Sequence, residues 1–168
     1  FLALVLISID AIGVSNLMTV GVARWLEERY SIPRANLVIS STHSHATPHQ
    51  TGLISNLYPV PSTAEQIEAS ARYTEKVHRA IEQAIAQAME SRVIAKLAMG
   101  QAQGGFAINR RALTAGTWSG FGEQADGPVD RRVRLLVARS NDDQIVGAAY
   151  MYACHCTTPG SNAEVSGD

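Results

Sequence analysis

Two histidines separated by one residue follow a short β-prone segment, in the sequence Ser41-Thr-His43-Ser-His45. Side chains at alternate positions of an extended chain point to the same side, so the two imidazoles can approach one ion. The spacing suits zinc but is not specific for it, because two ordinary polar residues at a strand–loop junction would give the same pattern. The motif therefore marks a candidate metal site without deciding it.

A third histidine, His155, ends the apolar run of residues 148–154. Polar residues at the ends of buried strands often form sites in α/β proteins, although such a histidine can also bond only to backbone groups at the core edge. If the two strand ends converge, His43 and His155 can bind the same ion. Imidazole suits zinc better than magnesium or calcium, and a catalytic zinc acidifies water for hydrolysis. A further ligand should come from elsewhere in the parent protein.

The first part of the chain has the pattern of a βαβ unit. Residues 1–9 and 37–41 are apolar, β-prone runs, and between them Ser15 can cap a helix that ends before Pro33. We expect a right-handed crossover between parallel strands. The expected apolar face of the helix comprises Leu17, Val20, Val22, Trp25 and Leu26.

The remainder alternates loops, one long helix and strands. Residues 43–61 form a long loop, and the capping-box match at residues 62–65 begins a helix that extends to about Met89. Strands are expected at residues 93–99, 132–139 and 145–156, with a glycine-rich excursion at 100–128 and a turn at 140–144. The pattern predicts an α/β fold with a mixed β-sheet and flanking helices.

The bulk composition excludes one class of partner. The chain has 168 residues, 46% of them hydrophobic and 17% charged, with a net charge of -1, so no electrostatic footprint for nucleic acid is present. The length fits one domain or part of one. Because the sequence begins without Met in a buried-strand pattern, we interpret residues 1–168 as a fragment truncated at both ends.

Four motifs occur in a fixed order along the chain, namely Asp10-Ala-Ile-Gly13, Ile39-Ser-Ser-Thr-His43-Ser-His45, Ile108-Asn-Arg110 and Tyr152-Ala-Cys-His155. In these motifs the sequence resembles the neutral/alkaline (non-lysosomal) ceramidases. The similarity covers nearly the whole chain and corresponds to the N-terminal portion of the catalytic domain. Residues 1–168 are therefore interpreted as a partial ceramidase-like catalytic domain.

The resemblance assigns roles to individual residues. It implies that His43 and His155 bind Zn²⁺, that His45 contacts substrate or handles a proton, and that Arg110 contacts substrate near the metal. The remaining ligands of the family, a glutamate and a tyrosine, would lie beyond residue 168. For Arg110 the alternative is a solvated arginine in the pair Arg110-Arg111.

The resemblance also implies an activity and a setting. The family reaction is hydrolysis of the ceramide amide to sphingosine and a fatty acid by zinc-bound water, in proteins that act outside the cytoplasm or at membrane surfaces. The isolated fragment is expected to be inactive, because ligands are missing. The chain has Ala46-Thr-Pro48-His49 where the family usually has Ser-Gly-Pro, and Cys156 where it often has proline, so the true substrate stays open.

Two other function classes compete with this interpretation. The chain could be a non-catalytic α/β module whose histidines only satisfy backbone groups. It could also be a metal-independent cysteine hydrolase that uses Cys154 or Cys156, although buried cysteines more often behave as small apolar residues.

Overall fold

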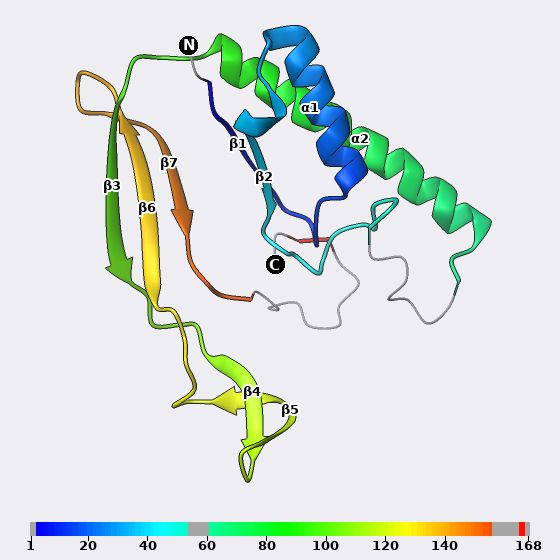
Figure 1. Ribbon diagram of the computed structural model, residues 1–168, viewed down its shortest axis with the longest axis vertical. Coiled ribbons are helices and arrows are strands. Elements are labelled where there is room, and N and C mark those ends of the chain that lie inside the picture. Colours follow the sequence, from blue (N-terminus) through cyan, green and yellow to red (C-terminus); the bar gives the residue numbers. More distant parts are fainter. Residues whose placement is uncertain (1–2, 54–60, 156–164, 167–168) are drawn as a thin grey trace. The chain divides into compact units, whose positions relative to one another are not determined.

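A computed structural model describes residues 3–53, 61–155 and 165–166. The chain divides into two compact units (Figure 1). The first contains the chain up to Ser91 together with the C-terminal residues, and the second spans Arg92–His155. Cys156 lies outside the described residues, as does most of the later half of the expected 43–61 loop.

The first unit begins with the predicted βαβ arrangement. Strand β1 (Val5–Ile9) and strand β2 (Leu37–Ser41) pair in parallel, and helix α1 (Asn16–Tyr30) and a short 3₁₀ helix (Arg34–Asn36) connect them. The Ser15 hydroxyl accepts a hydrogen bond from the Met18 amide at 3.1 Å, which confirms the expected N-cap. The helix ends at Ser31 in a left-handed conformation, two residues before Pro33.

Helix α2 (Ala64–Glu90) follows the loop and begins one residue later than predicted. Its capping box uses Thr63 and Gln66, whose side chains exchange hydrogen bonds with each other's backbone amides at 3.2 and 2.9 Å. The expected capping box at residues 62–65 was wrong. Residues 62–65 and 63–66 both match the capping-box pattern, so the sequence alone does not choose between them. Only the local geometry distinguishes them.

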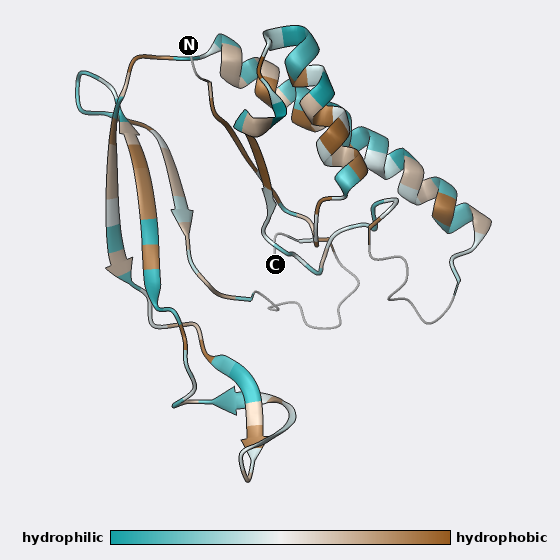
Figure 2. Ribbon diagram, in the orientation of Figure 1, coloured by the Kyte–Doolittle hydropathy of each residue, from teal (hydrophilic) through white to brown (hydrophobic). Residues whose placement is uncertain are grey.

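The core of this unit lies between the two helices and one face of the β1–β2 pair (Figure 2). Its buried side chains come from α1, α2, β2 and the segment before β2: Met18, Val22, Ala23, Leu26, Ile32, Leu37, Ile81 and Ile85. The expected α1 face was partly wrong, since Leu17 is 73% and Val20 45% exposed. The buried stripe is set by Met18, Val22 and Leu26, spaced four residues apart.

The second unit contains only strands. Strands β3 (Lys96–Gln103), β6 (Arg132–Arg139) and β7 (Ile145–Met151) form an antiparallel sheet in the order β3-β6-β7. Strands β4 (Asn109–Thr114) and β5 (Thr117–Gln124) form a hairpin inside the segment that we expected to be an irregular excursion. The two residues that connect them, Ala115 and Gly116, both have positive φ, as tight hairpin turns require.

The α/β class is confirmed, and the described strands divide among three sheets. Strand β6 has the predicted bounds, and the expected turn after it is closed by a hydrogen bond from the Ser140 amide to the Gln144 carbonyl at 2.9 Å. Strand β7 ends at Met151, so His155 follows the strand by four residues instead of ending it. None of the helices in the described part of the chain is long and apolar enough to cross a bilayer.

Candidate active site

The carboxyl ends of β1 and β2 position His43. The Thr42 amide donates to the Ile9 carbonyl at 3.0 Å, and the Thr42 hydroxyl donates to the Asp10 carboxylate at 3.0 Å. His43 itself has a left-handed backbone (φ 66°), a conformation that is uncommon for residues other than glycine and that recurs at functional sites. The chain therefore leaves the strand at His43.

The imidazole of His43 is oriented by the segment that follows β1. Its Nδ1 lies 2.6 Å from the Ile12 carbonyl oxygen, and because a carbonyl can only accept, Nδ1 is the donor, so that in the neutral tautomer compatible with this bond the lone pair is on Nε2. Metal-binding histidines are commonly held in this way, with one nitrogen bonded to a carbonyl and the other directed to the ion. The donor set at His43 thus fits zinc.

His45 lies beside His43, as the spacing predicted. The ring centroids are 4.9 Å apart and the ring planes are nearly perpendicular, at 85°. Both histidines are exposed, whereas Ser44 and Ala46 are buried. The Ser44 hydroxyl accepts from the Ala46 amide at 3.2 Å and donates to the Ser166 carbonyl at 3.3 Å. This alternation turns both imidazoles outward on one side.

The loop after His45 is attached to α2. The Thr74 hydroxyl accepts from the Thr51 amide at 2.8 Å, and the His49 ring lies between the Leu53 carbonyl at 2.8 Å and the Ser70 hydroxyl at 3.4 Å. The role of His49 in the described structure is to hold the histidine loop against the helix.

Within the second unit, a cavity of about 350 Å³ is lined by both Arg110 and His155. Three short segments form its walls: Phe106, Ala107, Ile108, Asn109 and Arg110; then Pro128, Val129 and Asp130; then Ala153, Cys154 and His155. The lining mixes apolar side chains with a guanidinium, a carboxylate and an imidazole. Such a mixture can bind an amphipathic molecule through its polar end.

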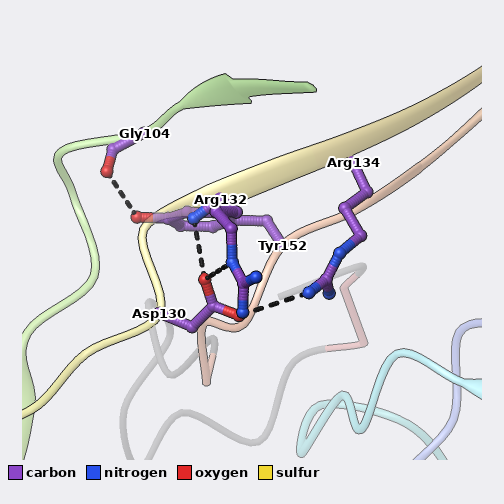
Figure 3. Close-up of polar contacts among 5 residues, drawn as sticks. All are labelled: Gly104, Asp130, Arg132, Arg134 and Tyr152. Carbon is purple, nitrogen blue, oxygen red and sulfur yellow. Dashed lines mark hydrogen bonds and ion pairs between the residues drawn. The ribbon is translucent and has the colours of Figure 1, made fainter. Parts of the chain in front are cut away.

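Tyr152 ties the first wall of this cavity to the third (Figure 3). Its hydroxyl donates to the Gly104 carbonyl at 3.0 Å and accepts from the Ala107 amide at 3.1 Å. Its ring packs on Phe106 with centroids 4.4 Å apart. Tyr152 belongs to the motif Tyr152-Ala-Cys-His155, but its hydrogen bonds across the cavity were not predicted from the sequence.

Asp130, in the second wall, is held by two arginines of β6 (Figure 3). Its carboxylate accepts two hydrogen bonds from the Arg132 guanidinium, both at 2.8 Å, and one from the Arg132 amide at 3.0 Å. The Arg134 guanidinium lies 3.7 Å away. The hydrogen bonds from Arg132 hold the pKa of Asp130 well below its usual range. The sequence did not predict the place of Asp130 in this cavity wall.

Comparison with known proteins identifies the family. The family described as "Neutral/alkaline non-lysosomal ceramidase, N-terminal" matches residues 2–168. The chain belongs to this family. A search of curated protein sequences finds no match. The resemblance drawn from the four motifs is thereby confirmed.

Solved ceramidase structures share the fold. Neutral ceramidase from Pseudomonas aeruginosa aligns with a TM-score of 0.67 at 19% identity, covering 98% of this chain and 26% of that one. A structure titled "Ceramidase complexed with C2" aligns equally well, with 25% of its chain covered. The chain thus spans about a quarter of the length of these solved relatives.

Proposed function

We propose that this chain is the N-terminal part of the catalytic domain of a zinc-dependent hydrolase that cleaves the amide bond of a ceramide-like lipid. Family membership supports the reaction class. The single structural observation that supports the metal is the Nδ1 contact of His43 with the Ile12 carbonyl, because a histidine held in this way would present Nε2 to an ion. In this proposal His43 and His155 bind the ion, and the remaining ligands come from elsewhere in the full-length protein.

Zinc, when bound, would polarise the amide carbonyl and acidify water. The protein groups would then divide the remaining tasks. His45, whose ring lies beside that of His43, would accept a proton from the attacking water and return it to the amine as the C–N bond breaks. Arg110, in the cavity that also contains His155, would orient the polar end of the substrate. The products are a carboxylate and an amine.

Metal analysis of the full-length protein tests this proposal. Purified without chelator, the wild type should contain zinc, and His43→Ala and His155→Ala should each lower both the zinc content and ceramide hydrolysis. The matched control is His78→Ala, because His78 lies on α2 and pairs with Glu82 at 3.7 Å. A wild-type protein without zinc, or a His43→Ala variant with full activity, would reject the proposal.

The distance between His43 and His155 distinguishes the proposed metal site from a non-catalytic module. In a crystal structure of the full-length protein, the ring nitrogens of His43 and His155 should lie within about 5 Å, as two ligands about 2.0–2.1 Å from one ion require. The approach of His155 to His43 stays a prediction until then. A much larger separation would favour the module.

On the family resemblance alone, we also propose that the full-length protein acts outside the cytoplasm or at membrane surfaces. Cell fractionation followed by immunoblotting tests the compartment. Recovery of the full-length protein only in the cytosolic fraction would contradict this part of the proposal.

A further inference from the structure

Arg110 occupies an irregular position in the β4–β5 hairpin. The pairing shifts between Asn109 and Arg111, where the single residue Arg110 on β4 lies opposite two residues on β5, Gly122 and Glu123. Its Nε donates to the Gly122 carbonyl at 2.9 Å, which uses one of the five N–H groups of the guanidinium and leaves four for a ligand. Irregularities of this kind often redirect a side chain next to a site.

Asn109 uses both ends of its side-chain amide to fix the backbone around Arg110. Its Oδ1 accepts from the Arg111 amide at 2.9 Å, and its Nδ2 donates to the Pro128 carbonyl at 3.0 Å. The first bond sets the backbone that follows Arg110. The second joins the first wall of the cavity to the second, because Asn109 and Pro128 line it from different segments.

The backbone of Gly127, in the turn opposite Asn109, packs closely against the Asn109 side chain. A Cβ added to Gly127 would lie 2.7 Å from the Asn109 Cβ and 2.8 Å from its Cγ, distances that real side chains do not tolerate. The Gly127 amide also closes the turn on the Gln124 carbonyl at 3.0 Å. A glycine at this place lets the backbone approach Asn109 closely enough for the bond to Pro128.

From these contacts we infer that Asn109 is the positioning residue for Arg110, holding its guanidinium in the cavity that also contains His155. The inference rests on the proposed function, since it concerns where Arg110 meets substrate. Asparagine is suited because the site needs one acceptor and one donor on a short side chain. Aspartate keeps the acceptor for the Arg111 amide but turns an oxygen toward the Pro128 carbonyl.

A double-mutant cycle on the full-length protein tests the inference, with hydrolysis of a short-chain fluorescent ceramide as the readout. Asn109→Ala and Asn109→Asp should each lower kcat/KM by roughly 10- to 100-fold, because small misplacements of binding groups have effects of this size. In the Arg110→Ala background, Asn109→Ala should cost less than about threefold, since the residue it positions is gone. Equal losses in both backgrounds would overturn the inference.

Two controls separate positioning from folding. The zinc content of Asn109→Asp should stay near that of the wild type even though loss of the bond to Pro128 lowers the melting temperature somewhat, whereas a general folding defect would lower the zinc content as well. Asn141→Ala is the matched control, because Asn141 lies in the exposed turn between β6 and β7 and should leave kcat/KM unchanged. A loss of kcat/KM that follows the loss of zinc across the variants would overturn the positioning role.

Crystal structures make the inference independent of activity. In Asn109→Ala, the Arg110 Nε should move out of hydrogen-bonding distance of the Gly122 carbonyl, and an unmoved guanidinium would overturn the positioning role even in an inactive protein. If the wild type hydrolyses no ceramide while this displacement is observed, the proposed function fails and the positioning role of Asn109 stands.

Discussion

The ring of Tyr152 occupies the space where a side chain on Gly104 would stand. A Cβ at Gly104 would lie 2.9 Å from the Tyr152 Cε2 atom, and the Tyr152 hydroxyl already donates to the Gly104 carbonyl. The segment before His155 is thus fixed to the end of β3. The geometry of the third wall of the cavity therefore depends on Gly104 and Tyr152, two residues that are not among those lining the cavity.

Replacing the glycine tests this packing. Gly104→Ala should destabilise the full-length protein and lower its zinc content, because the new methyl group must displace the ring that holds the His155 segment. Gly105→Ala is the matched control, since a Cβ there meets nothing within 4 Å. Thermal unfolding and metal analysis of the two variants make the comparison. Equal behaviour of both variants would contradict the packing argument.

Removing the Tyr152 hydroxyl tests the hydrogen bonds alone. Tyr152→Phe keeps the ring but leaves the Ala107 amide and the Gly104 carbonyl without this partner, so unfolding free energy should fall by about 1–3 kcal/mol. Tyr150→Phe is the control, because that side chain is exposed on β7. Denaturant unfolding gives both values. If Tyr150→Phe lowers the unfolding free energy as much as Tyr152→Phe does, the hydrogen bonds of the Tyr152 hydroxyl do not account for the loss.

The pH dependence of stability tests the Asp130 cluster. Because the hydrogen bonds from Arg132 lower the pKa of folded Asp130, its stabilisation is fully present above the unfolded pKa of about 3.9 and is lost as pH falls toward the folded value. The melting-temperature difference between wild type and Asp130→Asn should therefore be constant from pH 7 to 5 and shrink in stronger acid.

A second variant assigns that pH dependence to the ion pair. In an Arg132→Gln background, Asp130→Asn should change the melting temperature much less, because the main hydrogen-bond donor is already gone. All measurements would be made with chelator present, so that metal loss does not add its own pH dependence. If the melting-temperature difference between wild type and Asp130→Asn persists unchanged at low pH, the charge of Asp130 does not contribute to the stabilisation.

The parts of the fold that could be predicted depend on residues that are close together in the sequence. Ser15 as a cap, the end of α1 before Pro33 and the parallel pairing of β1 with β2 follow from local patterns. The exposed Leu17 shows the limit, because apolar spacing alone does not say which side of a helix the core will occupy. That choice is made by α2, through Ile81 and Ile85.

The missed features depend on contacts between distant segments. The β4–β5 hairpin lies in a glycine-rich stretch whose alternation is broken by two shifts in pairing, although its Ala115-Gly116 turn could have been recognised. Asp130 resembled a solvated charge because its neighbours in sequence are arginines. Its place in a cavity wall follows only from the approach of residues 106–110 and 153–155.

His45 gives the sharpest test of how the metal would be held. With its ring 4.9 Å from that of His43, it could bind zinc as a third histidine or serve as the proton carrier beside the ion. We expect the second role. In the full-length protein, His45→Ala should keep the zinc content of the wild type and lower kcat by about 10²–10⁴-fold, the usual effect of removing a general acid or base.

The isolated chain provides the complementary measurement. If His43 and His155 are its only metal ligands, the 168 residues should bind zinc weakly and hydrolyse no ceramide, because a catalytic zinc normally needs three protein ligands. Calorimetric titration with zinc should then show little difference between the wild-type chain and His45→Ala, whereas His43→Ala should abolish binding. Tight binding by the isolated chain that disappears in His45→Ala would instead establish a three-histidine site. In that case the full-length His45→Ala variant should lose its zinc as well, and the proton-carrying role would have to be assigned to another residue.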